Sequence, residues 1–181
     1  YKNDSVLVRK SLDINRVSTD RCIERISPYC NYALRASKPI LFLGVAYKPN
    51  VSDTRESPSI DVMRSVTNLL ENHHIWHKFP EYIPPRLIQY YDPHNPSVEI
   101  PSANGKGTYV LNSTEDVEKS ISEAGVVVVC VNHAEFSELK DILVDKALNG
   151  VNPGYSNLRA LPQPLEDRVV FDFCGMFKGD S

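Results

Sequence analysis

The hydrophobic positions of the chain fall into short continuous runs, separated by stretches in which apolar and polar residues mix. Two runs, Pro39–Ala46 and Gly125–Val131, show no polar alternation. Runs of this length, bounded by turn residues, are typical of strands that are buried on both faces. Shorter runs at Leu87–Tyr91, Thr108–Leu111 and Arg168–Phe173 are interpreted in the same way. The pattern therefore predicts five strands.

Helical periodicity fills the segments between these runs. Ser57-Pro58 places an N-cap residue before a proline at the first helical position, and an apolar stripe follows as far as Leu70. Ser113–Asp116 is a capping box that predicts a second helix. Phe136–Leu148 predicts a third helix, which the stop signal Asn149-Gly150 closes.

The N-terminal region predicts a helical segment and not a complete domain. Ser18 can cap a helix there. Cys22, Ile23 and Ile26 follow at the spacing of one helix face. Farther along the chain, strands that alternate with helices predict right-handed crossovers. The expected fold is α/β: a doubly wound, Rossmann-like, five-stranded parallel sheet with helices on both faces, preceded by an N-terminal helical linker.

Composition limits the functions that this fold can carry. Of the 181 residues, 41% are hydrophobic and 24% are charged, which is typical of a folded domain and not of a disordered chain. The 20 basic and 23 acidic side chains give a net charge of −3, without the basic excess of a nucleic-acid-binding protein. No apolar run approaches the roughly 20 residues of a membrane span. We expect neither nucleic acid nor a membrane as a partner.

The cysteines indicate a reducing compartment. They form no CxxC pair and no zinc spacing, so we expect free thiols in a cytoplasmic protein. Cys130 lies inside an apolar run and is expected to be a core thiol. Cys174 follows the last strand but has no nearby histidine or glycine-rich loop to activate it as a nucleophile. The chain begins at Tyr1 without a methionine, which suggests a piece of a longer protein.

The loop Tyr47–Ser57 carries the richest chemistry. It combines Lys48, Arg55 and a helix N-terminus, whose free N–H groups and dipole favour an anion. In doubly wound sheets ligands bind at the carboxyl ends of the strands, where this loop is expected. The prediction is a phosphate or diphosphate ligand. The alternative is that Lys48 is solvated and that Arg55 pairs with Asp53 or Glu56.

Two other kinds of site have weaker support. Only Gly44 stands where a dinucleotide-binding GxGxxG turn needs three glycines. Asp92 ends the second strand, where Rossmann domains keep an acid for a ribose hydroxyl, but it lies 48 residues after Gly44, while that motif spaces them by about 20. His73, His74 and His77 suggest a metal, yet no cysteine or carboxylate stands at ligand spacing, and we expect no metal site.

Several motifs resemble a known family. The segment Phe42–Ser59 (FLGVAYKPNVSDTRESPS) closely resembles the opening of the C-terminal domain of the UDP-glucose/GDP-mannose dehydrogenase family. Tyr91–Pro93 after the second strand, Val131–Phe136 after the fourth and Asp172 at the end of the fifth match in the same order. Ile14-Asn15 resembles the end of the central linker of these enzymes. The resemblance covers most of the chain.

This resemblance implies an oxidoreductase, an NAD-dependent nucleotide-sugar 6-dehydrogenase. Such enzymes oxidise the C6 alcohol of a nucleotide sugar to a carboxylate with two NAD+ in succession, and their products enter polysaccharide biosynthesis. An N-terminal Rossmann domain binds NAD, a central helical region forms a homodimer, and the C-terminal domain binds the substrate nucleotide. By resemblance, residues 1–36 are the end of the central region and residues 37–181 are the nucleotide-sugar-binding domain. The expected ligand is UDP-glucose or a UDP-N-acetylhexosamine.

The resemblance also assigns roles to residues. Tyr47 and Lys48 would contact the UDP-sugar, and Arg55 would reach the phosphates of the NAD cofactor. None of the cysteines has the glycine-flanked setting of the family nucleophile, so we expect no catalytic residue and no activity in this chain alone. Cys174 stands where many members carry a nucleotide-contacting arginine. The alternative is a non-catalytic nucleotide-sugar-binding or regulatory module that kept the fold.

Overall fold

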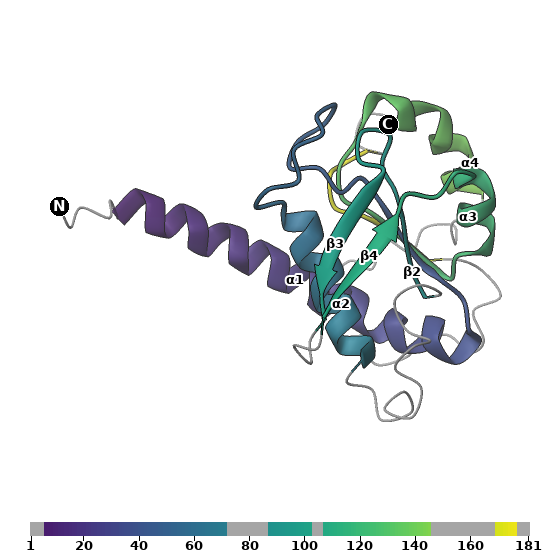
Figure 1. Ribbon diagram of the computed structural model, residues 1–181, viewed down its shortest axis with the longest axis horizontal. Helices are drawn as coiled ribbons and strands as arrows, with labels where there is room; N and C mark the ends of the chain where they lie inside the picture. The colour runs from purple at the N-terminus through teal and green to yellow at the C-terminus, as the bar shows by residue number, and fades with distance from the viewer. Residues whose placement is uncertain (1–5, 72–86, 103–106, 146–168, 177–181) are drawn as a thin grey trace.

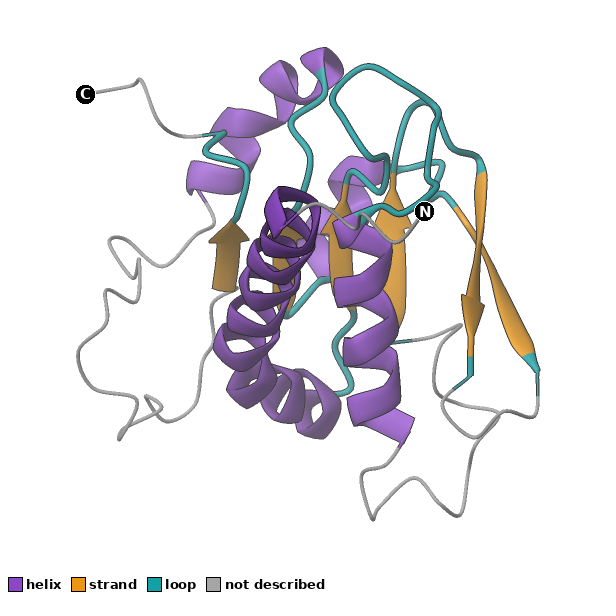
Figure 2. Ribbon diagram, turned by 90° about the vertical axis from the view of Figure 1, so that its left-hand side faces the viewer, coloured by secondary structure: helices purple, strands orange, loops and turns teal. Residues whose placement is uncertain are grey.

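A four-stranded parallel sheet forms the centre of the protein. The computed structural model describes residues 6–71, 87–102, 107–145 and 169–176. The strands are β1 (Ile40–Leu43), β2 (Ile88–Tyr91), β5 (Val126–Val129) and β6 (Val169–Asp172), in the order β2-β1-β5-β6, and every neighbouring pair is parallel. Figure 2 shows these strands behind two long helices. The predicted α/β class is confirmed.

Helices cover both faces of this sheet. Helix α1 (Val6–Ala36) and helix α2 (Pro58–Glu71) pack on one face. On the other face lie α3 (Val117–Glu123), the 3-10 helix η3 (Ala134–Leu139) and α4 (Lys140–Asp145). The N-terminal part of α1 extends away from the other elements (Figure 1). None of the helices in the described ranges combines the length and the hydropathy that a bilayer span requires.

The two covered faces explain why the central strands are apolar throughout. All residues of β1 and β5 are buried. Successive side chains of a strand point to opposite faces, so Phe42 joins the cluster under α1 and α2 while Leu41 and Leu43 join the opposite cluster. The expectation that these runs are buried on both sides is confirmed.

The main sheet has four described strands where the sequence predicted five. The segment predicted from Thr108 is β4 (Thr108–Asn112), which pairs antiparallel with β3 (Ser97–Pro101) in a separate hairpin (Figure 1). Only Leu111 of β4 is buried, and a strand with one covered face belongs at an edge and not in the centre of a parallel sheet. The apolar pattern does not predict β3, because the prolines before it and at its end, Pro96 and Pro101, are typical of turns.

Two predicted helix starts differ in the structure. Helix α2 begins at Pro58 as predicted, but α1 begins at Val6 and runs through Ser18, which therefore caps nothing. Helix α3 has Asp116 as its N-cap, with a side chain that accepts a hydrogen bond from the backbone N–H of Lys119 (2.9 Å). Ser113 directly follows the last residue of β4, four residues before the start of α3, and is therefore too far from α3 to be its N-cap.

The predicted Phe136–Leu148 helix lies within the described residues only as far as Asp145. The structure has η3 from Ala134, followed directly by α4 as far as Asp145. The predicted stop at Asn149-Gly150 lies outside the described ranges. A 3-10 turn ahead of an α-helix is common, and it shifts the start of the predicted helix by a few residues.

Gly44 is required where β1 ends. It has φ +79°, and an added Cβ would lie 2.5 Å from the carbonyl oxygen of Val131. We expect Gly44→Ala to lower the free energy of unfolding by about 2–3 kcal/mol, through left-handed backbone strain and this clash. Denaturant unfolding measures the loss. Gly107→Ala is the matched control, because nothing lies within 4 Å of its added Cβ. Equal denaturant midpoints for Gly44→Ala and Gly107→Ala would contradict the requirement for glycine at position 44.

Candidate functional site

The carboxyl edge of the sheet is where a ligand is expected. Strand β2 lies on one side of β1, and the chain then returns past β1 to form β5 on the other side. Helix α2 after β1 and the helices after β5 cover opposite faces of the sheet, and such a switch point is the usual ligand site of a doubly wound sheet. We call residues 44–57, between β1 and α2, the β1–α2 loop.

Asp92, directly after β2, ties the start of this loop to the neighbouring strand. Its carboxylate is buried, and Oδ2 accepts hydrogen bonds from the backbone N–H groups of Val45 (2.7 Å) and Ala46 (3.2 Å). Oδ1 accepts from the backbone N–H of His94 (2.9 Å) and from the amide of Asn95 (3.0 Å). The suggested ribose-binding role of Asp92 is therefore wrong, because the carboxylate is buried and binds the protein's own donors.

These donors also set the charge of Asp92. Burial by itself raises the pKa of a carboxyl group, because it penalises the charged form. The hydrogen bonds from Val45, His94 and Asn95, together with nearby His133, outweigh that effect and bring the pKa of Asp92 below its ordinary value. Asp92 is thus a carboxylate throughout the neutral pH range.

His133, after β5, is the second buried polar group at this edge. Its side chain is 0% exposed, and Nδ1 accepts a hydrogen bond from the backbone N–H of Asn50 (2.9 Å). Since an accepting ring nitrogen carries no proton, the proton of the neutral ring is on Nε2, which donates to Oδ2 of Asp92 (3.1 Å). The ring of Phe136 packs edge-on against the imidazole, 5.2 Å between centroids.

Asn50 completes a two-way connection between the loops after β1 and β5. Its backbone N–H donates to His133, and its side-chain Oδ1 accepts from the backbone N–H of Ala134 (2.8 Å). Asn50 has φ +60°, a conformation that asparagine tolerates better than most residues. We call this pair of hydrogen bonds the Asn50 latch.

The predicted ligand residues lie on the latched loop. Tyr47 is 47% exposed, and Lys48 is exposed beside it with Nζ 5.5 Å from the centroid of the Tyr47 ring. The backbone N–H of Tyr47 donates to the carbonyl of Asp53 (2.7 Å), which closes the loop on itself. The Ser57 hydroxyl donates to the carbonyl of Ala46 (3.1 Å), so the start of α2 is fixed to the end of β1.

Arg55 makes the ion pair that the sequence analysis gave as the alternative. Its Nε and Nη2 atoms bind the two carboxylate oxygens of Asp53 at 2.9 and 2.8 Å. The hydrogen bonds from the Arg55 side chain and then from its backbone N–H lower the pKa of Asp53 to about 2. The Arg55 side chain is 87% exposed, and exposed pairs of this kind are weak, so the guanidinium is accessible to a second anion.

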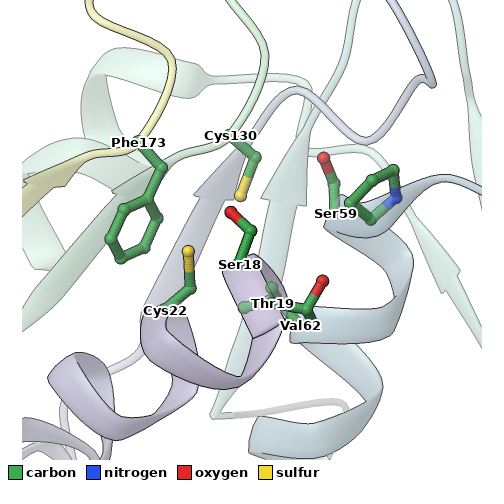
Figure 3. Close-up of a pocket in the computed structure, with 8 residues that line it drawn as sticks. Ser18, Thr19, Cys22, Ser59, Val62, Cys130 and Phe173 are labelled. Carbon is green, nitrogen blue, oxygen red and sulfur yellow. The ribbon is translucent and has the colours of Figure 1, made fainter. Parts of the chain in front are cut away.

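A pocket of about 150 Å³ opens at the same edge, between α1, the first turn of α2 and the ends of β5 and β6 (Figure 3). Eight residues line it: Ser18, Thr19, Cys22, Pro58, Ser59, Val62, Cys130 and Phe173. Cys130 thus lies half-buried at the pocket wall and not in the core as predicted, because β5 ends one residue earlier. Tyr47, Lys48 and Arg55 are not among the lining residues.

The thiols are poor nucleophiles. All four cysteines are free, as expected. Burial raises the pKa of Cys22 and Cys130, and it raises that of Cys30 to about 12. Partial burial of the sulfur and the carboxylate of Asp172 raise the pKa of Cys174 to about 12. The thiolate is the attacking form, so a raised pKa lowers the reactivity of these groups near neutral pH.

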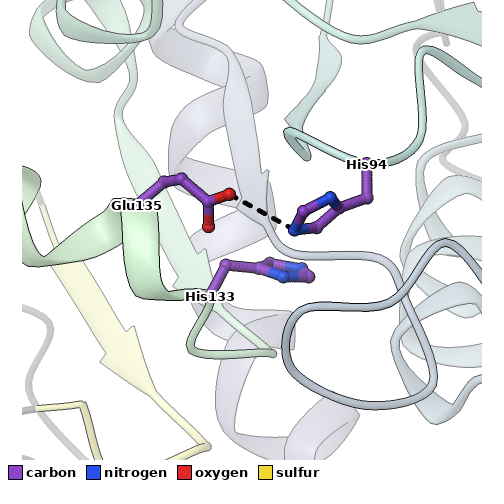
Figure 4. A group of neighbouring side chains, drawn as sticks. All are labelled: His94, His133 and Glu135. Atoms are coloured by element: carbon purple, nitrogen blue, oxygen red, sulfur yellow. Dashed lines mark ion pairs between the residues drawn. The ribbon is translucent and has the colours of Figure 1, made fainter.

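One cluster in the described residues has the spacing of a metal site. The ligand atoms of His94, His133 and Glu135 lie within 4.8 Å of one another (Figure 4). Both ring nitrogens of His133 already hold hydrogen bonds, to Asn50 and to Asp92. A metal would have to break one of them, and His94 instead lies 3.4 Å from Glu135 as an ion pair when protonated. His73, His74 and His77 lie outside the described residues.

Asn50 and His133 lie within the sequence motifs described above, but the sequence predicted no role for either residue. The local signal was weak, since only Asp92 follows its strand directly, whereas Asn50 lies seven residues after β1 and His133 four residues after β5. Their contacts depend on the order β2-β1-β5, which places the three strand ends side by side. Periodicity predicts that the strands exist and not the order in which they pair.

Comparison with known proteins gives a consistent picture. The model of the "UDP-glucose/GDP-mannose dehydrogenase family, UDP binding domain" matches residues 41–178. The UDP-N-acetyl-D-mannosamine dehydrogenase of Methanococcus vannielii is 30% identical over 145 residues, which are 80% of this chain and 27% of that protein. The NDP-N-acetyl-D-galactosaminuronic acid dehydrogenase of Ralstonia solanacearum is 25% identical over 134 residues, 74% of this chain and 26% of that protein.

Among solved structures, the UDP-D-ManNAc dehydrogenase of Pyrococcus horikoshii aligns with a TM-score of 0.46 and 21% identity. The alignment covers 78% of this chain and 28% of that one. The chain thus spans about a quarter of the length of the curated relatives that it matches.

Proposed function

Because the chain belongs to the UDP-glucose/GDP-mannose dehydrogenase family and matches the model of its UDP-binding domain, we propose that residues 37–181 bind the UDP portion of a nucleotide sugar. Residues 1–36, which contain all of α1, are proposed as the end of the region that joins this domain to the rest of a homodimeric dehydrogenase. In support, the N-terminal part of α1 extends away from the domain (Figure 1).

One observation carries the proposal: the β1–α2 loop is fixed at the carboxyl edge of the sheet with a lysine exposed on it. Asp92 and the Asn50 latch hold the loop, and Lys48 lies between them. The loop leads directly into α2, a 14-residue helix whose first N–H groups favour an anion. A flexible cation near a helix start is suited to a diphosphate, which offers several oxygens to both donors.

The remaining roles are proposed for the complete protein. It oxidises the C6 hydroxyl of a UDP-sugar to a carboxylate, a four-electron oxidation in which two NAD+ would accept the two hydrides and water would supply the second oxygen. Both curated relatives act on N-acetylated sugars by name, which supports a UDP-N-acetylhexosamine as the substrate. Arg55 fits a contact to the NAD diphosphate, because its guanidinium is exposed and has further N–H donors beyond the Nε and Nη2 atoms that bind Asp53. The nucleophile that the reaction needs is proposed to lie elsewhere in the protein.

A ligand series tests the proposal. We expect calorimetry on the 181-residue chain to give affinities in the order UDP, UMP, uridine, with each phosphate worth about tenfold or more through charge-assisted hydrogen bonds. Raising the salt concentration is expected to weaken UDP binding and to leave uridine binding unchanged. Equal affinity for UDP and uridine would show that the cationic loop does not hold the diphosphate.

A further inference from the structure

We propose that His133 is a positioning residue for nucleotide binding, and that its imidazole holds the β1–α2 loop in the conformation that receives the diphosphate. The inference rests on the proposed function, because the loop matters only if Lys48 binds the ligand. His133 is buried, and the proposed function gives it no contact with the nucleotide or the sugar.

The two ring nitrogens of His133 act on different partners. Nε2 donates to the carboxylate of Asp92 (3.1 Å), and Nδ1 accepts from the backbone N–H of Asn50 (2.9 Å). The side chains of His133 and Asp92 are both 0% exposed, so water does not replace the bond between them cheaply. The bond from Asn50 to Nδ1 is part-buried. The imidazole thus connects a fixed point in the sheet to a segment of exposed loop.

Lys48 lies midway between two anchor points of that loop. Two residues before it, the backbone N–H of Ala46 is bound by Asp92. Two residues after it, the backbone N–H of Asn50 is bound by His133. Both anchors lead to the same carboxylate, because His133 itself is held by Asp92. Loss of the imidazole acceptor therefore removes one of the two bonds of the Asn50 latch, on the C-terminal side of Lys48, and leaves the anchor at Ala46 intact.

The consequence for binding follows from preorganisation. When only a fraction of the molecules holds the loop in the competent conformation, the apparent dissociation constant rises by the inverse of that fraction. Residues 47–52 are exposed, so the latch and the backbone hydrogen bond from Tyr47 to Asp53 are what restrict them. A loop that is competent one-tenth of the time binds UDP about tenfold more weakly.

Two substitutions at His133 separate its two bonds. In His133→Gln, the amide nitrogen reaches the position of Nε2 and can donate to Asp92, but no acceptor faces Asn50. In His133→Asn, the amide oxygen takes the position of Nδ1 and can accept from Asn50, but no donor reaches Asp92. A purely structural role predicts that both variants lose UDP affinity in proportion to their loss of stability.

We expect instead that UDP affinity and stability change separately: the more stable variant, His133→Gln, should bind UDP more weakly than His133→Asn. His133→Gln should raise the UDP dissociation constant about tenfold, with a small change in unfolding temperature. In the ligand-free variant the Asn50 amide should exchange nearly as fast as an unprotected amide, because the loop is then open most of the time. His133→Asn should unfold at a lower temperature and yet keep both values within about twofold of the wild type. An unchanged Asn50 exchange rate and UDP affinity in His133→Gln would overturn the proposal.

A second variant covers the case in which neither His133 protein folds. Asn50 is exposed, and Asn50→Gly keeps its positive φ while it removes the oxygen that binds Ala134. Ser52→Gly, in the same loop, adds equal backbone freedom without touching the latch and serves as the control. We expect at least fivefold weaker UDP binding for Asn50→Gly than for Ser52→Gly, since only the former lowers the competent fraction specifically. Asn50→Gly keeps the backbone N–H that His133 binds, so this comparison tests only the second bond of the latch, the one to Ala134. The bond to His133 is tested in the wild type itself, where we expect the Asn50 amide to be protected from exchange without ligand. A wild-type Asn50 amide that exchanges as fast as an unprotected amide would overturn the proposal.

Failure of the positioning role and failure of UDP binding give different results. If the wild-type chain does not bind UDP, the proposed function fails, while exchange at Asn50 still reports whether His133 holds the loop. If the wild type binds UDP and His133→Gln binds it equally well, the positioning role fails and the proposed function stands.

Discussion

The Lys48→Ala protein is expected to bind UDP about 10- to 150-fold more weakly than the wild type, because a charge-assisted hydrogen bond to a phosphate contributes about 1.5–3 kcal/mol. Its unfolding temperature is expected to stay unchanged, since Lys48 is exposed and its described contact is with the neighbouring Tyr47 ring. Titration calorimetry with UDP gives the first value and thermal unfolding without ligand gives the second.

A matched control is available on the opposite face of the sheet. Lys119 is exposed on α3, so Lys119→Ala removes the same charge far from the β1–α2 loop. Lys119→Ala should bind UDP as the wild type does. Should Lys48→Ala and Lys119→Ala bind equally well, Lys48 would have no part in the site, and the diphosphate would have to be held elsewhere.

Asp92→Asn is expected to cause the largest loss of stability of the substitutions considered. The carboxylate accepts from five donors, and an amide of the same shape turns one of its two acceptor atoms into a donor. Breaking such a buried charged network costs about 3–5 kcal/mol, which lowers the unfolding temperature by roughly 6–20 °C for a chain of this size. UDP affinity should fall too, because Val45 and Ala46 lose their anchor.

The pH dependence of the unfolding temperature tests whether the charge of the Asp92 carboxylate causes this loss of stability. The pKa of Asp92 is lower in the folded protein than in the unfolded chain, so its ionised form stabilises the fold above about pH 4. This contribution disappears as the pH falls through the lower, folded-state pKa. The gap in unfolding temperature between wild type and Asp92→Asn should therefore narrow below about pH 4.

An exposed acid provides the comparison for this substitution. Asp20 lies on the exposed side of α1, and Asp20→Asn should unfold within about 0.5 kcal/mol of the wild type. A gap between wild type and Asp92→Asn that stays constant from pH 7 to pH 3 would contradict the role given to the Asp92 carboxylate.

The parts of the fold that follow from local pattern were predictable. The apolar runs of β1 and β5 have no polar face, which requires cover on both sides, and helices do cover both sides. Ser57-Pro58 marks the start of α2, because a proline at the first helical position lacks only an N–H that would have no partner. The exposed loop that carries Tyr47 and Lys48 follows from the same boundary.

The contacts that hold this loop were beyond local pattern. Asp92, His133 and Asn50 come from three different parts of the chain, and only the strand order places them together. Burial then decides their roles: a buried carboxylate binds backbone donors, whereas the sequence alone left a ribose contact open. The β4 error has a related cause, since a strand of five residues does not reveal which sheet it joins.

A structure of the chain with UDP bound tests the central claim most directly, through the distance from the Lys48 Nζ to the nearest phosphate oxygen. The account predicts a direct contact of about 2.7–2.9 Å, with the diphosphate facing the first turn of α2. A bound UDP whose phosphates lie away from the β1–α2 loop, with Lys48 still in solvent, would contradict it.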